Sequence, residues 1–474
     1  MGSSSLSGLL SSSTSSPQLG YNLCNMKHSL SALALVVLGS VWAQAEPISE
    51  IVQQVLQQAP AVLQAHEDVS AAERELGLFR QSLWMPQLTV SAVPIGFSEG
   101  NVHGNATLSV GLSLPTGTTL RLSYSGNLNY MSSSLRGTLS GEVTQPLLGL
   151  KLTDAALELD RRQGALEEAR QTLSETQRQV MLDALGSILD LTIAQESIEI
   201  AQARVEISRR RLDAVRDRVQ SGQAGQIELL TAQIELRQSE LTLAKLQRDF
   251  ALAQERFLVT YGLEKMPTWQ APVVKEEIKS LAEALLGLEV TPEVIAQDAR
   301  VRRALRQVAE SLVTTLKVQF DALPQLGLTV SYDPQSTGWS VGISVRHSFL
   351  TDQALKREEA QRALATAQRA FAAVRATVKA ELVAQRNALH EAYSQLEVVA
   401  LKGELIALHQ EMKQQQRERG LLSETDWEEF LIEKREFERE RRAALYQLAL
   451  AYLRYKNALG LSFSLEEVFD EQSY

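Results

Sequence analysis

Residues 120–130 read LRLSYSGNLNY, a stretch in which apolar and polar side chains alternate. Leucine or tyrosine stands at positions 120, 122, 124, 128 and 130, while arginine, serine or asparagine stands at 121, 123, 125, 127 and 129. Successive side chains of a β-strand point to opposite faces of the sheet. This period of two therefore predicts a strand with one apolar and one polar face.

The same alternation surrounds this stretch and returns later in the chain. It predicts four strands within about 88–145 and two within about 326–347. Strands of about ten residues between turns are typical of transmembrane β-strands, although a soluble antiparallel sheet with one buried face gives the same pattern. Aromatic residues near the strand ends fit girdles at the two membrane surfaces: Trp84, Phe97, Tyr130, Tyr332, Trp339 and Phe349.

Long helical segments follow each set of strands. From about 152 to 219, and again from about 352 to 419, small and apolar residues recur at helical spacing and form a packing seam. A helix of this length extends roughly 100 Å, about three times the hydrocarbon thickness of a bilayer. Because these segments are too polar for lipid, they predict rods that cross an aqueous space, which favours the membrane interpretation of the strands.

The chain carries this pattern twice. Gly222 and Gly262 stand 262 − 222 = 40 positions apart, as do Gly420 and Gly460, with 460 − 420 = 40. The sequence Pro-Gln-Leu starts both sets of strands, at 86–88 and at 324–326. This ordered set predicts a tandem duplication, in which each copy runs helix, strands, very long helix, turn and helix.

The N-terminal part predicts export. Residues 26–45 join the basic start Met26-Lys27-His28 to a short apolar run and an Ala-Gln-Ala end, which is the pattern of a secretory signal peptide. Residues 1–25 are expected to be a disordered leader or the result of a misassigned start. Cys24 is the only cysteine and precedes the signal, so neither disulfides nor thiolate metal sites are expected in the mature chain.

Composition and motif spacing disfavour other functions. The formal net charge of −10 disfavours a nucleic-acid partner. The six histidines lack metal-ligand spacing, and no phosphate-binding Gly-rich loop with lysine occurs. Residues 338–342 fit the Gly-x-Ser-x-Gly nucleophile pattern, but the alternation places Ser340 inside a strand instead of the required strand-turn-helix elbow. We therefore expect no catalytic residue, no metal and no cofactor.

With its Pro-Gln-Leu strand starts, the QPLLG motif at 145–149 and the Gly-led helical turns, the chain resembles the TolC family of outer-membrane efflux proteins from Pro60 to Gly460. The resemblance implies a mainly α fold with a transmembrane β-barrel. It implies a homotrimer, with the β-barrel in the outer membrane and an α-barrel extending into the periplasm. It also implies a periplasmic adaptor and an inner-membrane transporter as partners.

The number of strands departs from the family pattern. Family members commonly supply two strands per copy, hence twelve in the trimer. Four plus two strands here predict either eighteen strands or a hairpin outside the barrel wall, and both alternatives stay open.

The duplication sets the predicted divisions of the mature chain. A first copy covers 46–263, with a helical tip at about 220–226, and a linker or equatorial segment covers 264–291. A second copy covers 292–461, with a tip at about 418–424, and a C-terminal tail covers 462–474.

The resemblance assigns adaptor binding to the residues of the two tips. These residues also suit a simpler role as caps of a helical hairpin, and the two roles are compatible. The tip residues are Gly222, Gln223, Ala224, Gly225, Gly420, Leu421, Leu422 and Ser423.

Carboxylates follow the tips at matching positions. Asp426 and Glu228 each stand six positions after a tip glycine, and Glu429 follows Asp426 on the same helix face. The resemblance places Asp426 and Glu429 at the constricted entrance of the duct, where rings of carboxylates from three subunits favour cations. Glu228, at the matching position of the first copy, is predicted to contribute to the same entrance. The alternative is an acidic helix start that the helix dipole stabilises.

The function implied is that of a passive duct, not an enzyme, for small-molecule efflux or type I protein secretion. A periplasmic adaptor and an elongated coiled-coil protein of the cell envelope are the alternatives. An adaptor carries one helical hairpin, and a fibre explains neither the Gly-led tips nor the two sets of strands.

Overall fold

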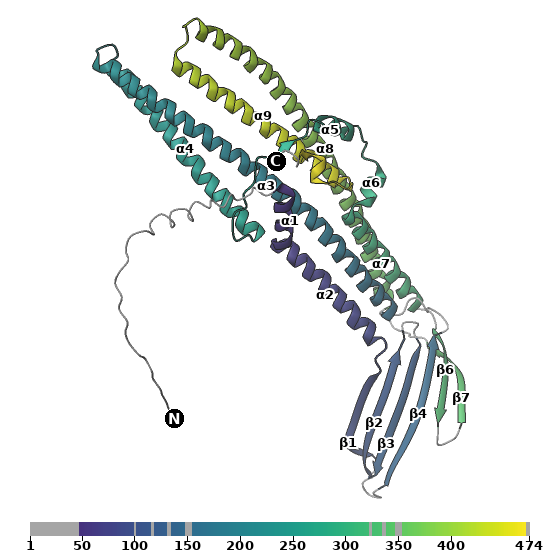
Figure 1. Cartoon of the computed structure of the whole chain (residues 1–474). Coiled ribbons are helices and arrows are strands. Elements are labelled where there is room, and N and C mark those ends of the chain that lie inside the picture. The colour runs from purple at the N-terminus through teal and green to yellow at the C-terminus, as the bar shows by residue number, and fades with distance from the viewer. Residues whose placement is uncertain are drawn as a thin grey trace, which may run out of the picture. The chain divides into compact units, whose positions relative to one another are not determined.

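The computed structural model describes residues 47–98, 101–114, 118–129, 134–146, 154–321, 325–333, 338–346 and 353–470. The predicted leader, signal peptide and Cys24 lie outside these residues, as do Tyr130 and Phe349. Within the compact unit Glu46–Tyr474, long helices are joined to one large antiparallel sheet (Figure 1).

The first half of this unit begins with two helices in sequence, α1 (Ile48–Gln58) and α2 (Pro60–Ser82). Pro60 occupies the first turn of α2, where its missing N–H costs no helical hydrogen bond. Four strands follow, and then the helical hairpin of α3 and α4: β1 (Gln87–Ser98), β2 (Asn101–Ser113), β3 (Thr119–Asn129), β4 (Ser134–Pro146), α3 (Asp154–Gln220) and α4 (Gln226–Tyr261).

The second half repeats this order with one pair of strands. Its elements are α6 (Pro292–Gln297), α7 (Ala299–Asp321), β6 (Gln325–Asp333), β7 (Gly338–Arg346), α8 (Gln353–Glu418) and α9 (Glu424–Ala458). The predicted tandem duplication is confirmed, and so are the four strands of the first copy and the two of the second. The outer limits assigned to the copies, 46–263 and 292–461, stay a prediction.

A small equatorial layer joins the halves. The linker forms β5 (Val273–Val274) and α5 (Ile278–Leu286), and the C-terminal segment forms the short helix η1 (Leu465–Glu467) and β8 (Phe469–Asp470). β5 and β8 pair in an antiparallel ladder, which fixes the C-terminal segment against the linker. Lys456 of α9 also holds the C-terminal segment, because its Nζ lies 2.6 Å from Glu467 Oε2 in η1.

The sheet has the strand order β1-β2-β3-β4-β6-β7, with every neighbouring pair antiparallel. The pairing of β4 with β6 joins the two copies. The register aligns the apolar positions of all six strands on one face, which we call the apolar face. Its members with described side chains include Leu88, Val90, Leu108, Val110, Leu122, Val143, Val330, Trp339, Val341 and Ile343.

The long helices pack side by side. α4 packs on α3, α3 on α9, and α9 on α8, while α2 packs on α3 and α7 on α8 near the strands. With 67 and 66 residues, α3 and α8 each extend roughly 100 Å. Among the described helices, none has the length and apolar character that crossing a membrane requires.

The core lies where α1 and α5 cover the middle of α3, α8 and α9. Ile51, Leu185, Ile278, Leu448 and Tyr455 are fully buried there. The predicted seams point inward, because Leu191 and Val205 of α3, like their counterparts on α8, are buried. Burying each such side chain stabilises the fold by about 1.5–3 kcal/mol. Towards the tips the core narrows to the small cluster of Leu212, Val215 and Ala232.

Candidate functional site: helical tips and a sheet with two faces

The turn between α3 and α4, residues 221–225, is the first tip. Gly222 has φ of +73°, and the amides of Gln223 and Ala224 donate hydrogen bonds to the carbonyl of Arg218. An added Cβ at Gly222 would meet no atom within 4 Å, so the glycine is required by its backbone conformation and not by crowding. Gly225, at φ of −93°, precedes α4 without a side-chain cap.

The turn between α8 and α9, residues 419–423, is the second tip, and it repeats this backbone. Gly420 has φ of +69°, and the amide of Leu421 donates to the carbonyl of Gln416. Here the following helix is capped, because Ser423 Oγ accepts a hydrogen bond from the Asp426 amide at 3.1 Å. The side chain of Leu421 is 75% exposed. The second tip therefore has the better-capped following helix and is also the more apolar turn.

Two of the three predicted entrance carboxylates lie against arginines. Arg218 Nη2 lies 2.6 Å from Glu228 Oε1 and closes the first hairpin on itself. Arg211 Nη1 lies 2.8 Å from Glu429 Oε1 and joins the two hairpins. Within the described part of the chain, the Asp426 carboxylate has no ion-pair partner. Asp426 is therefore the member of the set whose charge is not locally balanced.

The pairing of Glu429 belongs to a ladder between α3 and α9 that the sequence did not reveal. Arg204 pairs with Glu436 at 2.8 Å, and Arg210 pairs with Glu428. Near the core, Arg442 pairs with Glu196. Each pair forms between antiparallel helices at positions set by their axial register, a property that no local motif encodes. Beyond Arg211 the hairpins have no further mutual ion pair among the described residues.

A second unforeseen group braces the second tip. The Arg417 guanidinium lies 4.9 Å from the ring centre of Trp427 and 3.2 Å from Glu424 Oε1. Trp427 in turn contacts the ring of Phe430. These contacts bridge the turn from α8 to α9, so Gly420, Arg417 and Trp427 together fix its geometry.

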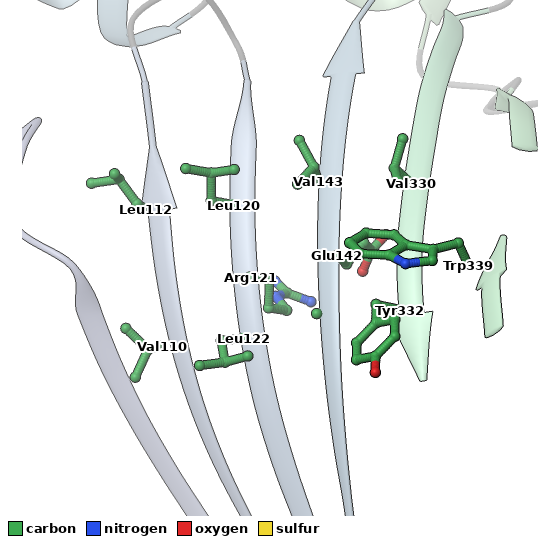
Figure 2. Close-up of a pocket in the computed structure, with 11 residues that line it drawn as sticks. Val110, Leu112, Leu120, Arg121, Leu122, Glu142, Val143, Val330, Tyr332 and Trp339 are labelled. Carbon is green, nitrogen blue, oxygen red and sulfur yellow. The ribbon is translucent and has the colours of Figure 1, made fainter. Parts of the chain in front are cut away.

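At the other end of the long helices the sheet has two chemically distinct faces. Figure 2 shows Val110, Leu120, Leu122, Val143 and Val330 on neighbouring strands, beside the tilted ring pair of Tyr332 and Trp339. They line a shallow hollow of about 420 Å³. Much of the apolar face is open, since Trp339 and Ile343 are 73% and 71% exposed.

The opposite face carries hydroxyl groups. Ser123 and Ser140 lie 2.8 Å apart through their Oγ atoms, and Ser125 and Thr138 lie 2.6 Å apart. The register also places Arg121 opposite Glu142. We call this the polar face. A sheet that exposes apolar side chains on one side and hydroxyls on the other suits a wall between lipid and water.

The Gly-x-Ser-x-Gly pattern at residues 338–342 lies within β7. Ser340 lies inside β7 opposite Ser331, as predicted, and not in a strand-turn-helix elbow. Among the described residues, no group of three or more His, Cys, Asp or Glu side chains is placed to hold a metal ion.

Comparison with known proteins points in the same direction. Residues 51–262 match the model of the outer membrane efflux protein family. No curated protein sequence matches the chain.

Solved structures with this fold are outer-membrane channels of low sequence identity. The CmeC outer membrane channel of Campylobacter jejuni is 12% identical, with a TM-score of 0.61 over 88% of this chain and 86% of that one. VceC, an outer membrane protein of Vibrio cholerae, is also 12% identical, with a TM-score of 0.58 over 88% of this chain and 97% of that one. Residues 51–262 therefore match the outer membrane efflux protein family, and the chain has the fold of the TolC-type outer-membrane channels.

Proposed function

We propose that three copies of this chain form a passive export duct that runs from the outer membrane across the periplasm. The observation that carries the proposal is the exposed apolar face, which extends over all six strands. The sheet is joined to helices that are roughly 100 Å long. Contact with lipid avoids the free-energy cost of exposing such a face to water. The helices are long enough to bridge the aqueous space below it.

Assembly is supported by the two outer helices of the hairpins. α4 and α8 stand at opposite ends of the row α4–α3–α9–α8. Both carry exposed apolar stripes, with Ile227 and Ile234 on α4 and Leu401 and Leu408 on α8. Two different surfaces at opposite edges of one subunit join head to tail, and such contacts close into a ring when the rotation allows it. In the ring, α4 of one subunit covers α8 of the next.

Partner proteins supply the energy that moves the cargo through the duct. The duct works with an inner-membrane transporter that supplies the energy and with a periplasmic adaptor that binds the tips. Adaptor binding involves Gly222, Gln223, Ala224 and Gly225 of the first tip and Gly420, Leu421, Leu422 and Ser423 of the second. Leu421 contributes most of the apolar contact, because it is the most exposed leucine of the turn.

The entrance selects for cations through carboxylates. Asp426 is the main contributor, since its charge is not balanced within the described part of its own subunit. Glu429 and Glu228 contribute less while Arg211 and Arg218 pair with them. Three Asp426 side chains around a narrow opening attract cations and repel anions.

A matched pair of variants on β7 tests the lipid-facing role of the sheet. Ile343→Arg places a charge on the apolar face, and Ser340→Arg places the same charge on the polar face. An arginine facing the middle of the bilayer costs about 2–4 kcal/mol, whereas the polar face tolerates it. We expect Ile343→Arg to lower the yield of detergent-extracted trimers from outer membranes at least tenfold and Ser340→Arg to leave it within twofold of wild type.

Either of two results would contradict the proposal. If both variants assemble to the same yield, or if the protein is recovered as a water-soluble monomer, the apolar face does not contact lipid and the proposal is wrong. A periplasmic adaptor or a fibre would give that result.

A further inference from the structure

We propose that the outer-membrane end of the duct is a single barrel of eighteen strands, closed by pairing of β7 from one subunit with β1 of the next. The inference rests on the trimer of the proposed function. It concerns the width of the exit and therefore the size of the cargo.

The sheet is continuous from β1 to β7. β1 pairs with β2 from Gln87 to Ser98, with one register shift, and therefore belongs to the same sheet as β3 to β7. Leu88 faces the same side as Val110 and Leu122, and it is exposed like Leu122. The β1–β2 hairpin thus continues the apolar face instead of forming a separate layer. A hairpin outside the wall would have no reason to keep this alignment.

The two edge strands of the sheet run in opposite directions. β1 and β7 are the edge strands of the sheet, and each neighbouring pair between them is antiparallel. With six strands, β7 runs opposite to β1, so a copy placed beside the first continues the antiparallel ladder without a break. Unpaired backbone groups are not tolerated in the hydrocarbon layer, so both edges must be covered. Three copies then give 3 × 6 = 18 strands.

The number of strands sets the width of the resulting passage. With strands about 4.8 Å apart and tilted by about 40°, eighteen strands give a backbone diameter of roughly 36 Å, against roughly 24 Å for twelve. Side chains about 5 Å long on the inner wall leave a passage of roughly 25 Å, against roughly 14 Å. An α-helix with its side chains is about 10–12 Å wide, so the larger passage admits two helices side by side.

The described central part of this lining shows little preference for charge. The polar face carries the hydrogen-bonded hydroxyl pairs Ser123–Ser140 and Ser125–Thr138. Its central charges, Arg121 and Glu142, stand opposite each other and largely compensate. The exit therefore accommodates bulky polar cargo, such as a polypeptide with helical structure, and leaves charge selection to the carboxylates at the other end.

Cysteine cross-linking between subunits distinguishes the two barrels. In a Cys24→Ser background, Thr89→Cys or Ser91→Cys on β1 is combined with Ser340→Cys or Gly342→Cys on β7, all on the polar face. Residues directly opposite each other in an antiparallel ladder have Cα atoms about 4.5–5.5 Å apart, within the range of a disulfide. The matched controls combine Ser123→Cys or Ser125→Cys on β3 with the same β7 positions.

Trimers extracted from outer membranes after mild oxidation are analysed on denaturing gels with and without reductant. We expect at least one β1–β7 combination to give covalent dimers and trimers that reductant dissolves, and no β3–β7 combination to do so. Links between β3 and β7 would show a twelve-stranded wall with the β1–β2 hairpin outside it. Intact trimers without any β1–β7 product would equally overturn the eighteen-stranded barrel. Failure of the Cys24→Ser parent to form membrane trimers would instead contradict the proposed function itself.

Discussion

The two helical tips share one backbone and differ in their side chains. In both, a glycine with φ near +70° lies in the turn between a helix of more than 60 residues and a helix of about half that length. The first tip is polar and ends in the uncapped Gly225, whereas the second exposes Leu421, is capped by Ser423 and is braced by Arg417 against Trp427. The two copies therefore share the backbone of the turn but expose different side chains. The difference predicts that the two tips meet different surroundings in the proposed duct.

The largest expected effect separates the carboxylates that follow the tips. Asp426→Ala should lower the ratio of cation to anion permeability several-fold, because in the proposed duct its charge lies at the entrance without a local counterion. Glu228→Ala is the matched control and should change the ratio by less than 1.5-fold, since Arg218 already balances Glu228. Reversal potentials of single trimers in planar bilayers under a salt gradient measure both.

Low ionic strength sharpens this comparison, since the screening length is about 30 Å at 0.01 M and about 3 Å at 1 M salt. Equal effects of the two variants would remove Asp426 from the entrance. A larger effect of Glu228→Ala would place the selective ring on the first hairpin.

The next effect tests what the tips have in common. Gly222→Ala and Gly420→Ala should each destabilise their own turn by about 1–2 kcal/mol, because a Cβ disfavours the left-handed conformation. Neither site is crowded, so the two losses should agree. Amide hydrogen exchange of the tip peptides should rise roughly 5–30-fold at the altered tip alone. A large loss at only one tip would show that the shared backbone is not maintained by the glycines.

The smallest effect concerns the helix starts. Ser423→Ala removes the cap of α9 and should cost about 1 kcal/mol of local stability. Gly225→Ser should stabilise the start of α4 by a few tenths of a kcal/mol, because Gly225 has an extended backbone and open space around its Cβ position. Exchange rates of the first amides of each helix report both changes. A gain from Ser423→Ala would show that the cap is not formed.

Local periodicity explains how much of this fold was predictable. Alternation at 120–130 and the glycines at 222 and 420 act within a few residues, so the strands, the turns and the duplicated order were predicted correctly. The pairing of Arg211 with Glu429 was not, since it depends on the axial register of α3 against α9. The pairing of β4 with β6 likewise joins distant segments, and only the folded structure shows that the six strands form one sheet.

The proposed duct requires that the two faces of the sheet meet different solvents, with lipid on the apolar face and water on the polar face. It is tested most directly by spin labels at Ile343→Cys and Ser340→Cys in a Cys24→Ser background, with the trimer in lipid vesicles. We expect the label at 343 to be relaxed mainly by oxygen, which concentrates in lipid, and the label at 340 mainly by a water-soluble nickel complex. If the nickel complex reaches both labels equally well, the apolar face is not in the membrane and the duct model fails.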